Sequence, residues 1–302
     1  MPSTSSVNNR LGASGPPCRG DPLPAARSSR VIYLTMTSSA PHLGGNFTRR
    51  SEVMWCRSVA DMSNDAKAIN NTEPANTELA SARAATTFVA DLLCSLSDAQ
   101  LDADSLLPGW TRRHVVAHLA QNALAVGRLV SWAATGVETP MYESREVRDR
   151  DIDETALLAP STLCALFRDT ATALDEAWLA LPESRWSCEV RGGQGRVVPA
   201  SATLWMRTRE LWVHGVDLNA GAGFDALPER MLRRTLVDVV ASWPADRIRL
   251  DLTGPTVESI GDQNAQNSIS GSLADVTGWA TGRTTLGISS SESPVPTAPN
   301  WL

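Results

Sequence analysis

Apolar residues recur at intervals of three and four positions in four successive segments that begin at Thr77, and this spacing constrains the fold more than any other feature. Residues spaced in this way share one face of an α-helix, so each segment predicts an amphipathic helix. The segments cover residues 77–97, 111–132, 160–182 and 199–218. Four helices that each need a partner for an apolar face predict a bundle of about 140 residues.

The pattern of the sequence changes around and after the last of these helices. A short hairpin is predicted over 188–198, where two short strands flank a glycine-rich turn. A further helix is predicted over 228–243, and strict alternation of apolar and polar residues over 247–253 is typical of a half-buried strand. A second strand is expected at 267–270, followed by a short helix over 272–281 that begins with a serine cap.

The fold class expected from these patterns is a four-helix bundle over 76–222 followed by a small α+β domain over 223–302. Residues 1–75 are rich in Ser, Asn, Pro, Gly and Arg and are expected to form a disordered extension. An organellar transit peptide has a similar composition, but we favour a start codon assigned too early, with Met54 or Met62 as the true first residue.

The composition argues against two classes of partner. No stretch approaches the roughly 18 consecutive apolar residues of a membrane-spanning helix, so we expect no membrane insertion. The chain carries 33 acidic and 27 basic residues, a net charge of −6, and this charge repels a phosphate backbone. No basic stripe interleaved with aromatic residues is present either, so we expect no nucleic-acid partner.

The five cysteines are odd in number, widely spaced and without any C-x-x-C pair. In a chain of 302 residues this pattern argues against a disulfide framework and against a thiolate zinc cluster, so we expect a reducing, cytoplasmic location. Cys94 and Cys164 fall within apolar helical patterns, and we expect both to be small buried hydrophobic residues.

The last bundle helix carries a narrow polar strip between apolar neighbours. At about 100° per residue, four polar side chains fall within about 60° of one another: Thr203, Glu210, His214 and Asp217. The apolar remainder of the helix predicts that Glu210 and His214 point into the bundle. A buried carboxylate and a buried imidazole each need a partner, which one divalent metal ion would supply to both. A hydrogen bond between them, or with the second helix, is the alternative.

A third metal ligand has to come from one of the remaining histidines, His42, His114 and His118. His42 lies in the N-terminal extension. On the second helix His118 lies about 80° from the centre of the apolar arc and His114 about 120°, so we expect His118 at the edge of the buried face and His114 nearer the solvent. A histidine at such an edge is by default an ordinary core residue, but a His/Glu/His set has the ligand count of a catalytic zinc site with one open position.

Four runs of the sequence occur in order and at plausible spacing: 107–120, 136–142, 205–218 and 278–283. The first contains a Pro-Gly-Trp turn and two histidines, the third contains the Glu-x-x-x-His pair, and the last reads Gly-Trp-Ala-Thr-Gly-Arg. As a set they resemble the mycothiol-dependent maleylpyruvate isomerase family, whose N-terminal half belongs to the DinB-like metal-binding bundles. The resemblance spans about residues 77–302.

The resemblance also implies which residues form the site. In that family the metal is held by the second histidine of the first run and by the glutamate and histidine of the last bundle helix, which correspond here to His118, Glu210 and His214. The family's smaller C-terminal domain contributes an arginine, for which Arg283 is the candidate catalytic residue. A cation at the C-terminus of the preceding helix is the other interpretation of Arg283. Asp217 either orients a metal ligand or is an ordinary polar neighbour.

The function implied by the resemblance is an isomerase with mycothiol and Zn²⁺, or another divalent metal, as cofactors. A zinc-activated thiolate would add to the cis double bond of maleylpyruvate, allow rotation and leave as fumarylpyruvate forms. Arg283 would hold a substrate carboxylate. The alternatives are a mycothiol S-transferase acting on other electrophiles and a metal-binding sensor without turnover. The expected partners are a small electrophilic substrate and mycothiol.

Overall fold

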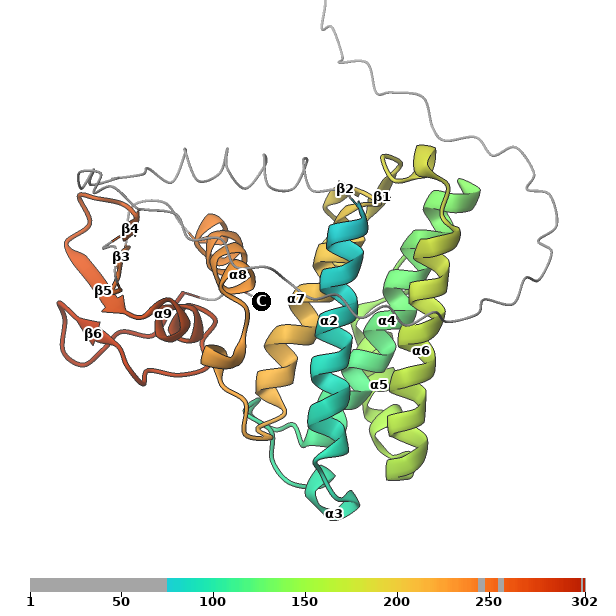
Figure 1. Ribbon diagram of the computed structural model, residues 1–302, viewed down its shortest axis with the longest axis horizontal. Coiled ribbons are helices and arrows are strands. Elements are labelled where there is room, and N and C mark those ends of the chain that lie inside the picture. Colours follow the sequence, from blue (N-terminus) through green and yellow to red (C-terminus); the bar gives the residue numbers. More distant parts are fainter. Residues whose placement is uncertain (1–74, 244–247, 255–257, 300, 302) are drawn as a thin grey trace, which may run out of the picture.

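The computed structural model describes residues 75–243, 248–254, 258–299 and 301, so the extension predicted over 1–75 lies, up to residue 74, outside the described residues. The larger part is a bundle of four long helices that stand side by side in Figure 1. These are α2 (Ala75–Cys94), α4 (Arg112–Thr135), α6 (Pro160–Ala180) and α7 (Ala202–Asp217). The elements attached to them are α3 (Asp98–Leu101), α5 (Arg145–Ala156), η1 (Glu183–Arg185), β1 (Glu189–Arg191) and β2 (Val197–Pro199).

The ends of the helices mostly follow local signals of the sequence. Thr111 is the N-cap of α4, and its backbone amide donates to Nδ1 of His114 at 3.2 Å. Gly136 ends α4 with φ of 76°, a conformation that glycine adopts without strain. The prediction that the last bundle helix begins at residue 199 is wrong: Pro199 ends β2, where a proline is tolerated at a strand edge, and α7 has Ser201 as its N-cap.

Helix α4 is central to the bundle, where it packs against α5, α6 and α7, while α2 covers α7 and α6. Residues 115–120 of α4 are buried without interruption. Such a run is typical of a helix enclosed on several sides rather than of a surface helix with one apolar stripe. Neither α4 nor any other helix of the described part is long and apolar enough to cross a membrane.

The C-terminal part is a small unit of helices and one sheet. Its elements are η2 (Phe224–Ala226), α8 (Glu229–Ser242), β3 (Ile248–Leu252), β4 (Glu258–Gly261), β5 (Asn267–Gly271), α9 (Leu273–Ala280) and β6 (Ser289–Ser290). The strand order is β4-β3-β5-β6, with β5 parallel to β3 and the outer strands antiparallel to their neighbours. The strands predicted at 247–253 and 267–270 are therefore confirmed. Strands β4 and β6 were not predicted, because they are short and lack the alternation of apolar residues.

Helix α8 joins the two parts and lies between α7 and the sheet in Figure 1. Leu232 packs into the core of the bundle, whereas Val239, two turns later, packs into the core formed by α8, α9 and the sheet. On the bundle side, Arg234 of α8 donates to Glu78 of α2 at 2.8 Å. The expected fold class, a four-helix bundle followed by a small α+β unit, is thus confirmed.

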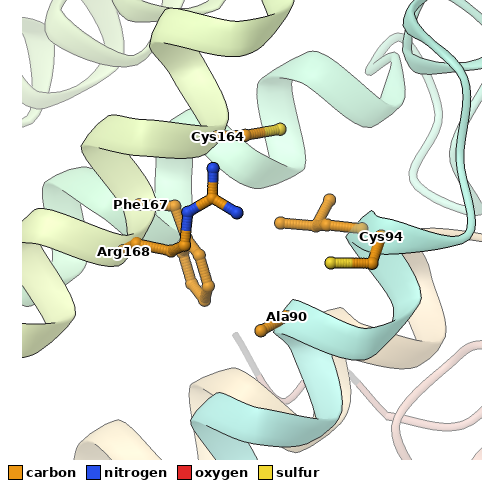
Figure 2. A pocket seen from close by; sticks show the side chains of 6 residues that line it. Ala90, Cys94, Cys164, Phe167 and Arg168 are labelled. Carbon is orange, nitrogen blue, oxygen red and sulfur yellow. The ribbon is translucent and has the colours of Figure 1, made fainter.

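The cysteines depart from expectation. Cys94 and Cys164 lie on the rim of a cavity of about 70 Å³ between α2 and α6, with the guanidinium of Arg168 beside it (Figure 2). The prediction that both thiols are buried is wrong for Cys94, which is exposed at the last residue of α2, and Cys164 is half-buried. Burial raises the pKa of the Cys164 thiol, which makes it a poor nucleophile at neutral pH. Cys188 is disulfide-bonded, contrary to the argument against disulfides drawn from the spacing of the cysteines.

Gly215 on α7 lies against the ring of Phe88 on α2. A Cβ atom on Gly215 would lie 2.5 Å from Cε1 of Phe88 and 3.0 Å from its Cδ1. We expect Gly215→Ala to lower the free energy of unfolding by about 1–3 kcal/mol, because overpacking outweighs the better helix propensity of alanine. Urea denaturation in the presence of a metal chelator measures this change.

Gly127 on α4 is the matched control, because a Cβ there would meet no atom within 4 Å. Gly127→Ala should raise the free energy of unfolding by about 0.5–1 kcal/mol. Equal stabilities for the two variants would contradict the close packing of α2 against α7.

Candidate metal centre

Three side chains from α4 and α7 meet inside the bundle. Nε2 of His118 on α4 lies 3.0 Å from Oε2 of Glu210 on α7, and Nε2 of His214 lies 3.3 Å from the same oxygen. The atoms that the three residues can offer to a cation all lie within 4.8 Å of one another. The structure therefore brings together the three residues selected from the sequence, and their role as metal ligands stays a prediction.

The position of each side chain follows from the helix that carries it. Glu210 and His214 are four residues apart on α7 and so project from the same face. His118 lies within the buried run of α4 and is 4% exposed, and His214 is 8% exposed. The Glu210 side chain is 17% exposed, so the cluster is closed by protein on most sides.

The arrangement fits a tetrahedral zinc ion. Bonds of about 2.0–2.1 Å at tetrahedral angles place neighbouring ligand atoms about 3.3 Å apart. Two of the three separations, 3.0 and 3.3 Å, are close to this value, and the third is within 4.8 Å. Two imidazoles and one carboxylate are also a donor set of catalytic zinc sites, which keep a fourth position for water or substrate. The residues present thus fit a single divalent cation.

His214 is oriented from its other ring nitrogen. Nδ1 lies 2.8 Å from Oδ2 of Asp217, a fully buried residue, and Asp217 accepts hydrogen bonds from Nε of Arg283 at 3.2 Å and from Nη2 at 3.0 Å. A carboxylate at Nδ1 keeps a proton on that nitrogen and directs Nε2 toward a metal. Arg283 also donates to the carbonyl of Thr281, just beyond α9. Asp217 therefore orients His214. Arg283 holds Asp217 and also caps the C-terminal end of α9.

Burial and hydrogen bonding set different charge states for the three side chains. Burial lowers the pKa of His118 to about 4, which its hydrogen bond with Glu210 offsets only in part. Burial disfavours protonated His214 too, but hydrogen bonds to Asp217 and Glu210 prevail and raise its pKa to about 9. Desolvation also acts on Glu210, yet hydrogen bonds with both imidazoles hold its carboxyl pKa well below the usual value. Without metal, the site at pH 7 holds an ionised Glu210, a protonated His214 and a neutral His118.

Two arginines that the sequence analysis did not select border the site. Arg207, three residues before Glu210, is 1% exposed and donates to the carbonyl of Leu119 and to Oδ1 of Asn122 on α4. Its spacing from Glu210 was a signal available in the sequence. Arg148 on α5 places Nη2 at 3.3 Å from Nδ1 of His118. No local signal predicts this contact, because it depends on how α5 packs against α4.

Among the described residues, His114 does not join the cluster. His114, expected nearer the solvent, is half-buried, and its Nδ1 lies 2.8 Å from Oγ1 of Thr111 at the start of α4. It therefore caps the helix. His42 lies outside the described residues.

The fold and the site define a helical-bundle protein with a candidate His/Glu/His metal centre and a C-terminal α+β unit. The Mycothiol maleylpyruvate isomerase N-terminal domain family matches residues 82–219. Crystal structures of the mycothiol-dependent maleylpyruvate isomerase, and of a variant with one histidine replaced by alanine, align at 39% identity with a TM-score of 0.73. Each alignment covers 77% of this chain and 99% of the other. This chain belongs to the mycothiol-dependent maleylpyruvate isomerase family, a family of enzymes.

A Bacillus subtilis protein described as a probable metal-dependent hydrolase with an unusual four-helix bundle topology aligns at 17% identity and a TM-score of 0.42, over 54% of this chain and 89% of its own. No curated protein sequence gives a significant match. The family resemblance stated from the sequence is confirmed by the solved isomerase structures.

The carboxylate of Asp217, which lies 2.8 Å from Nδ1 of His214, should affect the affinity of the site for zinc. We expect Asp217→Asn to weaken zinc binding by about 10- to 100-fold, because the ring of His214 loses the anion that fixes its tautomer and orientation. Competition with a zinc-binding dye measures the affinity. Asp238→Asn on α8 is the control, because Asp238 bonds Trp205 and Arg209 and contacts none of the three candidate ligands. Equal affinities for the two variants would rule out this role of Asp217.

The charge state of the metal-free site generates a second prediction. Zinc binding at pH 7 should release about one proton per ion, because His214, with a pKa of about 9, is protonated beforehand and His118, with a pKa of about 4, is not. Apparent affinity should therefore rise about tenfold per pH unit from pH 6 to 8 and level off above pH 9. Calorimetry in buffers of different ionisation enthalpy counts the protons. A pH-independent affinity over this range would be the contrary result.

Proposed function

We propose that this protein is a mycothiol-dependent maleylpyruvate isomerase, which converts maleylpyruvate to fumarylpyruvate at a zinc centre formed by His118, Glu210 and His214. The observation that carries the proposal is the convergence of these three side chains in a chain that aligns, at 39% identity, over 99% of a solved mycothiol-dependent maleylpyruvate isomerase. The donor set and the atom separations support a cation with one open position.

The chain's own residues would prepare this centre for a thiol. When bound, mycothiol would supply a sulfur that adds to the cis double bond and leaves after rotation, and a divalent cation would keep that thiol deprotonated at neutral pH. Glu210 and the two imidazoles fix the place of the cation. Asp217 keeps the Nδ1 proton on His214, and the buried surroundings limit access of water to the reacting atoms.

Arg283 is our candidate catalytic residue. Addition of a nucleophile to an alkene conjugated with a carbonyl moves negative charge onto the carbonyl oxygen, so a nearby cation stabilises the transition state. Arg283 commits three N–H groups to Asp217 and Thr281. A guanidinium has five, and we propose that the remaining two contact a substrate carboxylate.

The same proposal covers the organisation and setting of the protein. We infer a metal-binding domain over 76–222 and a second domain over 223–302, which brings Arg283 to the first through Asp217. We infer that the partners are mycothiol and a small electrophilic substrate rather than nucleic acid, which the net charge of −6 supports. We also infer that the reaction takes place in the cytoplasm.

The test is turnover by purified, zinc-loaded protein. With mycothiol and maleylpyruvate we expect fumarylpyruvate to accumulate, and the absorbance of the product measures its rate of formation. Glu210→Ala should lose about one equivalent of metal and at least 100-fold in rate, because the central anion of the cluster is gone. The control is Glu154→Ala on α5, whose side chain is 69% exposed and which should keep both metal and rate.

The products distinguish the alternatives. Accumulation of a stable mycothiol conjugate with other electrophiles, without isomerisation, would favour the S-transferase. Stoichiometric zinc binding without any turnover would contradict an enzyme acting on these compounds and favour the sensor.

A further inference from the structure

Arg148 approaches the candidate metal centre through His118, whereas Arg283 reaches it through Asp217 and His214. It lies on α5, and its Nη2 is 3.3 Å from Nδ1 of His118. Its Nη1 donates to Oδ1 of Asp149 at 2.6 Å, and the centre of the guanidinium lies 5.8 Å from the centroid of the Tyr142 ring. The contact with His118 is therefore a direct one between a permanent cation and a candidate metal ligand.

The contact indicates which ring nitrogen of His118 carries the proton. A guanidinium can only donate, so Nδ1 of His118 accepts, and the ring proton resides on Nε2, where it is directed to Glu210. If His118 holds a cation through Nε2, its proton has to reside on Nδ1 instead. Two donors would then face each other. The contact between Arg148 and His118 thus belongs to the metal-free site, and metal binding leaves the guanidinium without that acceptor.

Arg148 is also the most accessible of the three arginines at the site. The Arg207 residue is 1% exposed and bonded to α4, and the Arg283 side chain is 13% exposed and held by both carboxylate oxygens of Asp217. The Arg148 side chain is 28% exposed. Its partner Asp149 has a side chain that is 51% exposed, and ion pairs this open to water are weak. A ligand anion can therefore reach Arg148 and compete for it.

The charges around the site favour such an anion. The carboxylates at the site are Glu210, Asp217 and Asp149, and they balance the guanidinium groups of Arg148, Arg207 and Arg283. A divalent cation would add two further positive charges. The excess of positive charge suits a ligand that brings more than one negative charge.

We propose that Arg148 is a substrate-binding residue that takes one carboxylate of a dicarboxylate substrate, while Arg283 takes the other. This rests on the proposed function for the position of the metal and deepens it, because it makes a second carboxylate the feature that selects the substrate. When Nε2 of His118 holds the cation, Nδ1 carries the ring proton and no longer accepts from Arg148. The guanidinium can then donate to the ligand instead. The Tyr142 ring beside it forms one wall of the subsite.

Binding of succinate to the zinc-loaded, full-length protein tests the proposal, because succinate carries two carboxylates and no double bond. Calorimetry should show saturable binding to the wild-type protein. Arg148→Met, which keeps the length of the side chain, should weaken it at least tenfold, and Arg148→Lys should restore part of it because charge returns without the two-pronged geometry. The control is Arg145→Met on the same helix, whose side chain is 86% exposed and which should match the wild type.

Zinc affinity gives a readout that does not depend on activity. If Arg148 serves the substrate, Arg148→Met should bind zinc as tightly as the wild type or more tightly, because a cation in contact with His118 has been removed. A merely structural role predicts weaker zinc binding and a lower melting temperature. Unchanged succinate affinity in folded, zinc-loaded Arg148→Met would overturn the proposal, as would the absence of saturable succinate binding to the wild type.

The outcomes separate this inference from the proposed function. Succinate binding that depends on Arg148, in a protein that does not isomerise maleylpyruvate, would support the subsite and reject the reaction. Isomerisation with a KM for maleylpyruvate that is the same in wild type and Arg148→Met would support the reaction and reject the subsite.

Discussion

The interaction on which the rest of the site depends is the burial of Glu210 between two imidazoles. An ionised carboxylate inside a helical bundle is unfavourable by several kcal/mol unless partners compensate it. His118 and His214 do so at 3.0 and 3.3 Å, which requires that α4 and α7 keep one relative position. The tight contact of Gly215 with Phe88 helps to fix that position from the side of α2, one residue beyond His214.

The C-terminal unit takes part in the same network. Arg283 holds Asp217, and Asp217 holds the ring of His214, so the second unit is connected to the candidate centre by hydrogen bonds through a fully buried carboxylate. Helix α8 adds contacts at another level, such as the 2.6 Å hydrogen bond from Trp205 to Asp238. A displacement of the C-terminal unit would therefore change the orientation of a candidate metal ligand as well as the position of Arg283.

Much of the bundle could be predicted from the sequence, because the spacing of apolar residues in each long helix indicates which face is buried. The same geometry selected Glu210 and His214, which share one face of α7, and His118 on α4. What helical spacing could not supply is contact between elements far apart in the chain. The approach of Arg148 to His118 depends on how α5 packs, and the short polar strands β4 and β6 form only because β3 and β5 offer them edges. The same limit applies to Arg283, for which family resemblance, rather than periodicity, indicated a role.

The central claim is that one cation lies between His118, Glu210 and His214 with a coordination position left open. X-ray diffraction from crystals of the zinc-loaded protein, recorded on both sides of the zinc absorption edge, tests it most directly. The account predicts one strong anomalous peak at about 2.0–2.2 Å from Nε2 of each imidazole and from a carboxylate oxygen of Glu210, with room for one more ligand. A peak elsewhere in the protein, or one beyond bonding distance of any of the three side chains, would contradict it.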